Sequence, residues 1–205
     1  MEHQKIPLRS FFLRIAVILL VFMIGIMGLV LKRHNDFINS GILSTARSYH
    51  TTLMLFWKWN SSNGGLFTMS KPGAKPDLKN HVIMTREVFR YSMQAGSPVF
   101  TITSFTPLNE AGIFETDALR SFQKGAREYF RKEKSGGRVF FRYMAPLVAD
   151  RSCLACHATQ GYTEGSITGG IGVSIDITSA MRSLLFQNIS TIIISIVGFA
   201  LLLIL

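Results

Sequence analysis

The chain has 205 residues, 48% of them hydrophobic, and a formal net charge of +10 at pH 7. The segment between its two longest apolar stretches, residues 32–183, has a length that suits one domain with a single core, and it contains no internal repeat. No paired-carboxylate site, phosphate-binding glycine loop or Ser-His-Asp pattern stands out. We therefore expect no enzyme activity in these residues.

The first apolar stretch, Ile15–Leu31, is free of charge and would be about 25 Å long as a helix. A cleavable signal peptide has a shorter apolar region and a cleavage site of small residues, which this run lacks. Basic residues flank the run on both sides, so the distribution of positive charge gives little indication of how the helix is oriented across the membrane. We expect residues 1–31 to form a cytoplasmic N-terminus and transmembrane helix 1, an uncleaved signal anchor.

A helical pattern continues after residue 32. Apolar residues recur there at three- and four-residue steps: Ile38, Ile42, Tyr49, Leu53, Phe56 and Trp57. We expect this helix to extend the first membrane helix outward until Asn63-Gly64-Gly65 breaks it. Leu66–Met69 predicts the start of a sheet, Lys71–Pro76 a loop, and Val82–Met93 a second helix.

The next segments alternate between strand and helix signals. Val99–Ser104 is β-branched and aromatic, which predicts a strand, and Thr106–Gly112 predicts a loop. Apolar residues from Ala118 to Phe130 mark one face of a helix, which we expect to end at Gly136-Gly137.

Two further strands are predicted by alternation, at Arg138–Leu147 and at Ile171–Ile177. Together with the predicted helices, these strands indicate an α+β fold. We expect a PAS/Cache-like antiparallel sheet with flanking helices, bracketed by two transmembrane helices.

The second apolar stretch, residues 184–205, is long enough to cross a bilayer and predicts transmembrane helix 2. The sequence stops inside this stretch without a basic cytoplasmic flank, so we expect a helix truncated from a longer protein. Two helices around one exported domain are the layout of a bacterial sensor. A doubly anchored cytochrome is the alternative.

The most informative motif is Cys153-Leu154-Ala155-Cys156-His157, which holds the only two cysteines of the chain. In a C-x-x-C-H motif, the two thiols form thioethers to a haem and the histidine is the proximal iron ligand. A structural zinc site needs a fourth ligand, a thioredoxin-like pair needs a strand-to-helix setting, and a disulfide leaves His157 without a role. We therefore predict one covalent haem c per chain.

Thioether attachment of haem belongs to the outer side of the energy-conserving membrane. We therefore expect residues 32–183 to be an extracytoplasmic (periplasmic) domain at the bacterial inner membrane. This segment holds 19 Lys and Arg against 11 Asp and Glu. An exported domain is no partner for nucleic acid, so the positive charge suggests a solvated surface near anionic membrane lipid.

Several segments recur in the same order in a known family: Trp59-Asn60 with Gly64-Gly65, Met84–Glu87, Arg142–Leu147, Cys153–His157 with Gln160–Tyr162, and Gly169–Ile171. The chain resembles the PAS-like c-type-haem sensor domain of bacterial membrane signalling proteins, formerly a domain of unknown function. This resemblance implies an extracytoplasmic sensory module with covalent haem, often joined to a histidine kinase, diguanylate cyclase or chemotaxis output. In one departure, Asn63 replaces a histidine that the family often has.

The second axial ligand of the iron has several candidates. Met84 comes first because it lies in a family-like segment, and its thioether would raise the reduction potential relative to a second imidazole. His50 and His81 are alternatives that would give bis-histidine iron. Core packing of Met84, or a vacant or water-filled position, remains an alternative.

Three residues are predicted to surround the haem. Arg142 and Arg151 could pair with its propionates, because a guanidinium group suits carboxylate geometry, or could simply be solvated. Tyr162 could line the porphyrin or belong to the ordinary core.

Our leading hypothesis is a sensory domain that detects redox state or a small haem ligand and transmits it through the membrane helices. The alternative is a membrane-anchored monohaem cytochrome c that relays electrons to a redox partner; a Cache-type binding domain with structural haem is a third. The apolar stripe of Phe37–Trp57 suits a homodimer. A cytoplasmic signalling module, such as a kinase, is expected beyond Leu205.

Overall fold

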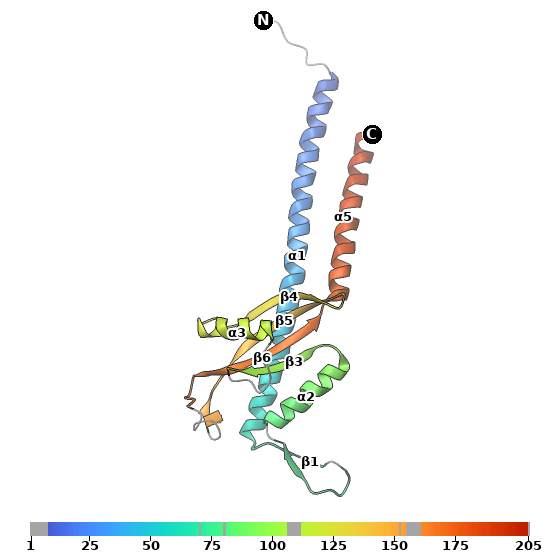
Figure 1. Cartoon of the computed structure of the whole chain (residues 1–205). Coiled ribbons are helices and arrows are strands. Elements are labelled where there is room, and N and C mark those ends of the chain that lie inside the picture. Colours follow the sequence, from blue (N-terminus) through green and yellow to red (C-terminus); the bar gives the residue numbers. More distant parts are fainter. Residues whose placement is uncertain are drawn as a thin grey trace. The chain divides into compact units, whose positions relative to one another are not determined.

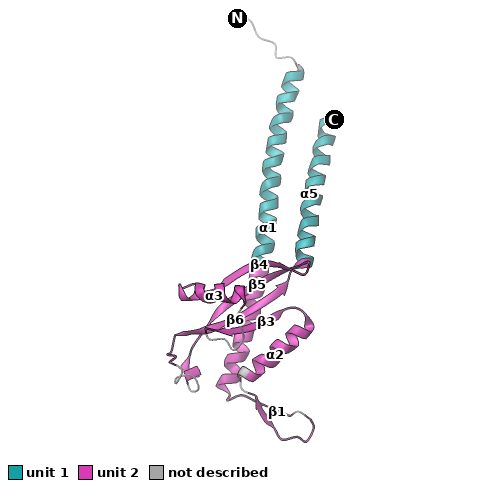
Figure 2. Ribbon diagram, in the orientation of Figure 1, with its two compact units in different colours: residues 1–41, 179–205 teal, residues 42–178 magenta. Residues whose placement is uncertain are grey.

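The structure is a computed structural model that describes residues 8–69, 71–79, 81–105, 112–151, 153–154 and 161–204. Its elements are α1 (Leu8–Ser62), β1 (Leu66–Thr68), β2 (Asp77–Lys79), α2 (His81–Ala95), β3 (Val99–Ser104), α3 (Ile113–Gln123), β4 (Tyr129–Ser135), β5 (Arg138–Val148), β6 (Ile167–Asp176) and α5 (Thr178–Ile204) (Figure 1). They form two compact units, residues 1–41 with 179–205, and residues 42–178 (Figure 2).

The first unit consists of the N-terminal part of α1 and nearly all of α5. Both helices contain 18-residue windows apolar enough to cross a membrane, and none of the described residues in these windows is buried. Phe22 and Ile194, for example, expose 67% and 70% of their surface. Continuous exposed apolar surface of this kind is unfavourable in water and suits lipid, so length and composition indicate membrane association.

The centre of the second unit is a four-stranded antiparallel sheet with the strand order β3-β6-β5-β4. β6 lies inside this sheet, where Ile171 is opposite Ile102 of β3 and Ala145 of β5. Residues 169–173 of β6 are buried on both faces because helices cover both sides of the sheet. The predicted α+β class and antiparallel sheet are confirmed.

One face of the sheet is covered by α1 and α2, and we call it the α1–α2 face. Leu53 of α1, Phe89 of α2 and Ile171 of β6 form its buried cluster. Phe89 also stacks on Phe100 of β3, with ring centroids 5.8 Å apart. Each buried side chain of this size contributes roughly 1.5–3 kcal/mol to folding, so this face fixes α1 and α2 on the sheet.

The opposite face, the α3 face, is covered by α3. Phe114, Phe122 and Met144 are at most 1% exposed and form its core together with Ala118 and Leu119. Neighbouring residues of a strand point to opposite sides, which is why Met144 of β5 contacts α3 while Tyr143 faces α1.

One predicted helix is wrong in its second half. The apolar pattern indicated a helix from about residue 116 to Gly136-Gly137, but α3 ends at Gln123 and residues 129–135 form β4. Gly125 has a φ of 89°, which ends helical geometry shortly after α3. Gly136 and Gly137 both have positive φ and link Ser135 to its partner Arg138, so the glycine pair is a two-residue hairpin turn between β4 and β5.

Glycines on β6 allow close approach of its neighbours. A Cβ on Gly169 would lie 2.1 Å from the carbonyl oxygen of Thr103 on β3. On the α3 face, a Cβ on Gly170 or Gly172 would lie 2.9 Å from Sδ or 3.3 Å from Cε of Met144, respectively. The methionine side chain therefore fills the space that Gly170 leaves open, whereas at Gly172 the nearest atom to an added Cβ would be Oγ1 of Thr101, at 2.4 Å.

The remaining elements agree well with the predicted ones. α1 runs without a break to Ser62, and Asn63 donates to the carbonyl of Trp59 over 2.7 Å at its end. β1 starts a sheet as predicted, although this is a separate two-stranded sheet with β2, which was not predicted. β3 coincides with its predicted range, whereas most of the predicted loop 106–112 lies outside the described residues.

Candidate functional site

The first part of the C-x-x-C-H motif follows the end of β5. Ala149 is 3% exposed and exchanges backbone hydrogen bonds with Gly165 and Ser166, which fixes the point where the chain leaves the sheet. The Oδ1 atom of Asp150 then accepts a hydrogen bond from the backbone N–H of Cys153 over 3.2 Å. An aspartate in this position caps a helical turn, so Asp150 sets the direction in which the motif begins.

The thiol of Cys153 lies 3.5 Å from Oδ1 of Asp150, is half-buried, and is a free cysteine. Residues Cys156 and His157, the predicted second thioether and proximal iron ligand, lie outside the described residues. Within the described ranges, no group of three His, Cys, Asp or Glu residues is arranged to hold a metal ion. The roles of these three motif residues remain predictions from the sequence.

The Met84 candidate lies where the last turn of α1 meets the start of α2. Its Sδ atom is 3.6 Å from Nδ2 of Asn60, which is fully buried. The same Nδ2 lies 3.4 Å from the carbonyl oxygen of Lys79. Oδ1 of Asn60 is buried and has no hydrogen-bond partner among the described residues. Sequence reasoning did not select Asn60 as a site residue.

The His50 candidate lies farther up α1, against the middle of β5. Its ring contacts Tyr143 edge-on with centroids 5.9 Å apart, and its Nε2 atom is buried without a partner in the described part of the chain. Burial lowers the pKa of His50, so its imidazole is neutral, the form that can ligate a metal. Burial and the nearby Glu128 carboxylate raise the pKa of Tyr143 to about 12.

The two candidates mark different positions in the domain. Ten residues separate His50 from Asn60, which corresponds to about 15 Å along a helix. Along β5, Tyr143 contacts His50, and Leu147, which is closer to Cys153 in sequence, packs against the cluster of Leu53, Phe89 and Ile171. His50 and the Asn60–Met84 contact therefore lie at separate positions along α1.

The side chain of His81, the third candidate, lies outside the described part of the structure. Tyr162 is described and half-buried, and it follows Gly161, whose φ is 85°, in the loop before β6. Arg151 next to the motif is 88% exposed in its side chain and pairs with Glu164 over 3.2 Å. An exposed pair of this kind contributes little to stability.

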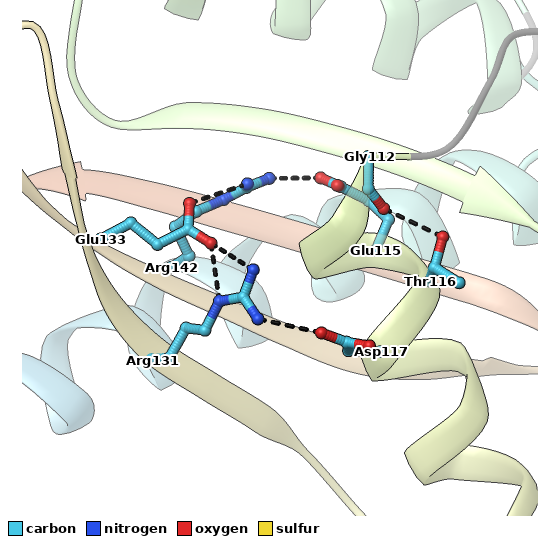
Figure 3. Close-up of polar contacts among 7 residues, drawn as sticks. All are labelled: Gly112, Glu115, Thr116, Asp117, Arg131, Glu133 and Arg142. Carbon is cyan, nitrogen blue, oxygen red and sulfur yellow. Dashed lines mark hydrogen bonds and ion pairs between the residues drawn. The ribbon is translucent and has the colours of Figure 1, made fainter.

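Arg142 lies on the α3 face, on the other side of the sheet from His50 and Met84. Its guanidinium group pairs with Glu115 of α3 and with Glu133 of β4 (Figure 3). It also lies 4.3 Å from the ring centroid of Phe114. Its placement near a haem propionate stays a prediction. In this structure its donors serve to attach α3 to the sheet.

A second arginine completes this charge network. Arg131 bridges Asp117 and Glu133, with 3.0 Å to Oδ2 of Asp117 (Figure 3). Burial alone would raise the pKa of Glu133, but the hydrogen bonds from Arg131 and Arg142 outweigh it and lower this pKa. The network is a structural link between α3, β4 and β5.

The antiparallel sheet with helices on both faces and a cysteine motif after its third strand define a PAS-like α+β domain. The model of the Tll0287-like family matches residues 32–176, and the chain belongs to this family. The chain is also similar to a solved structure described as the crystal structure of the cyanobacterial heme-protein Tll0287. The two share 14% identity with a TM-score of 0.44, over 63% of this chain and 93% of the other. Among curated proteins, none matches the chain.

Proposed function

We propose that residues 32–183 form an extracytoplasmic haem c sensory domain that detects redox state or a small haem ligand and signals through the membrane helices. The observation that carries this proposal is the C-x-x-C-H motif, which contains the only two cysteines of the chain and lies inside the family match. Cys153 and Cys156 would attach one haem, and His157 would be its proximal ligand.

The described residues fit such a group. The free thiol of Cys153 is available for a thioether, and Met84 and His50 each place a neutral donor on the α1–α2 face. The unpaired, fully buried Oδ1 of Asn60 marks a polar corner next to Met84, within the part of the chain that is described. Bound there, the haem would supply an iron that accepts one electron or binds a small ligand.

The sensory assignment is supported by the continuity of α1. This helix carries the apolar stretch Ile15–Leu31 and, without a break, the residues that pack on the sheet. A change on the α1–α2 face would therefore act on a helix that continues toward the membrane. The proposed partners are membrane lipid, a second copy of the chain and a cytoplasmic signalling module, without nucleic acid. We propose no enzyme activity for the 205 residues themselves.

The haem assignment is tested with the full chain matured in a bacterial host that attaches haem c. We expect the mass of the polypeptide to rise by one haem and the colour to remain with the protein after acid-acetone extraction. Cys153→Ser and Cys156→Ser should each retain at most one thioether, and the double variant should lose the haem on extraction. Full extraction of haem from the wild-type chain would refute covalent attachment.

Sensing is distinguished from electron transfer by hydrogen exchange of the oxidised and reduced chain. A sensor should change the exchange of α1 residues 42–62 with redox state or on binding of carbon monoxide. An electron carrier, the competing function, should show the same exchange in both redox states together with rapid electron transfer to a partner protein.

A further inference from the structure

The corner between the end of α1 and the start of α2 contains a buried polar contact that the proposed function does not explain. Asn60 is 0% exposed and Thr85 beside Met84 is 1% exposed. Asn60 directs its amide nitrogen at two acceptors, the carbonyl oxygen of Lys79 at 3.4 Å and Sδ of Met84 at 3.6 Å. A fully buried asparagine needs a reason, because a polar side chain in this place costs stability unless its hydrogen bonds are satisfied.

The orientation of this amide follows from its neighbours. A backbone carbonyl and a thioether are both acceptors, so the NH₂ group rather than the oxygen must face them. The oxygen is then left without a donor among the described residues. Within the described part of the chain, the side chain thus gives up one hydrogen bond in order to donate toward Lys79 and Met84. A core that needed only volume here would be better served by leucine, which has nearly the same shape.

The chemistry of the sulfur gives this arrangement a role. A thioether sulfur has two lone pairs and accepts hydrogen bonds weakly. With one lone pair directed at Nδ2 of Asn60, the free rotation of the flexible methionine side chain is restricted and the other lone pair remains available. A donor on a metal ligand also withdraws electron density from it, which stabilises the reduced metal relative to the oxidised metal.

We propose that Asn60 is a positioning residue for the distal ligand: its amide holds the thioether of Met84 toward the haem iron and raises the reduction potential. This inference rests on the proposed haem c function. It concerns Met84 and not His50, whose buried Nε2 atom has no hydrogen-bond partner within the described residues.

The test compares Asn60→Leu with wild type in the matured full chain. Leucine keeps the volume and removes the donor. We expect haem attachment and the melting temperature to be nearly unchanged, while the sulfur-to-ferric-iron charge-transfer band shifts or weakens. At a fixed ambient potential, the ratio of reduced to oxidised haem should fall about fivefold, the effect of one hydrogen bond of ordinary net strength.

Two further variants complete the test. Asn63→Leu is the matched control, because Asn63 ends the same helix but donates to the carbonyl of Trp59 and is exposed. This variant should have the same charge-transfer band and the same reduction potential as wild type. Met84→Ala should abolish the band, and adding Asn60→Leu to it should have no further effect on the potential.

The outcomes separate the two proposals. If the wild-type chain carries covalent haem but Asn60→Leu changes neither its charge-transfer band nor its reduction potential, the proposed role of Asn60 is wrong. The haem c function is then unaffected. If Met84→Ala retains the charge-transfer band of wild type, the proposed role of Asn60 is wrong as well. Wild-type chain without covalent haem overturns both proposals.

Discussion

Arg47 of α1 donates through Nε to Oε2 of Glu128 over 2.9 Å, and its Nη2 atom donates to the other carboxylate oxygen. Such a two-point contact between guanidinium and carboxylate holds both groups in one relative orientation. Glu128 directly precedes β4, so this pair links α1 to the sheet in addition to the apolar cluster around Leu53. It also brings a carboxylate close to Tyr143 and hence to the surroundings of His50.

Replacing Glu128 with glutamine should destabilise the domain in a pH-dependent way. The hydrogen bond from Arg47 lowers the pKa of Glu128 below 4.5, against burial, which would raise it. A carboxylate whose pKa is lower in the folded than in the unfolded chain stabilises the fold, with full effect at a pH above the unfolded pKa. This contribution is lost as the pH falls through the folded pKa. The melting temperature of Glu128→Gln should therefore lie below wild type at pH 7, with the difference shrinking below pH 4.5. Thermal unfolding followed by circular dichroism measures this, and a difference that is constant down to pH 3 would contradict it.

His50 should make the chain less stable in mild acid. Its pKa is lowered from 6.5 by burial, so the unfolded chain takes up a proton at a pH where the folded chain does not. Stability should be insensitive to this group above pH 6.5 and should decrease as the pH falls below that value. In His50→Gln, this part of the decrease should be absent. Proton titration of the His50 ring by NMR gives a direct check, since a midpoint at or above 6.5 is incompatible with the burial seen here.

Arg142 should contribute to the stability of the domain through its ion pairs with α3 and β4. Arg142→Met removes the cation that pairs with Glu115 and Glu133 and should cost about 2 kcal/mol of unfolding free energy. Adding Glu115→Gln should restore part of this loss. Arg151→Ala, which breaks an exposed pair, should change the free energy by less than about 0.5 kcal/mol. Denaturant unfolding measures both. A shifted reduction potential in Arg142→Met would instead assign Arg142 to a propionate.

The hairpin between β4 and β5 should depend on its glycine pair. Gly136 and Gly137 have φ values of 54° and 73°, and an added Cβ would meet nothing within 4 Å at either position. Any loss is therefore conformational: Gly137→Ala should cost about 1 kcal/mol of unfolding free energy. Gly137→Asn should cost less, because asparagine tolerates the left-handed region. Equal losses in the two variants would point to a different cause.

Regular elements with a clear period were well predicted from the sequence. The helical spacing from Ile38 to Trp57 and the alternation of Arg138–Leu147 correspond to α1 and β5. The error at residues 129–135 arose because Tyr129 and Phe130 also fit the apolar face of the preceding helix. The glycine pair could have decided the matter, since two consecutive glycines between polar alternating segments favour a hairpin. β2 was missed because Asp77–Lys79 has little strand preference and depends on pairing with β1.

The candidate site was predictable only in part, for physical reasons. The cysteine motif is local in sequence, so its chemistry can be inferred without a fold. The partners of Arg142, by contrast, lie 27 and 9 residues away and are determined by how α3 and β4 pack on the sheet. The burial of Asn60 likewise follows from the meeting of two helix ends, which no periodicity reveals. Its occurrence in the family-like pair Trp59-Asn60 was the one available signal.

The side chain of Met144 on β5 occupies the space that the missing side chain of Gly170 on β6 leaves open. A large side chain on β5 leaves no space for one at the neighbouring position of β6. Natural variants should therefore have a large side chain on one of the two strands and rarely on both. A larger residue at position 170 would call for a compensating reduction at position 144. Positions 144 and 170 should consequently evolve together.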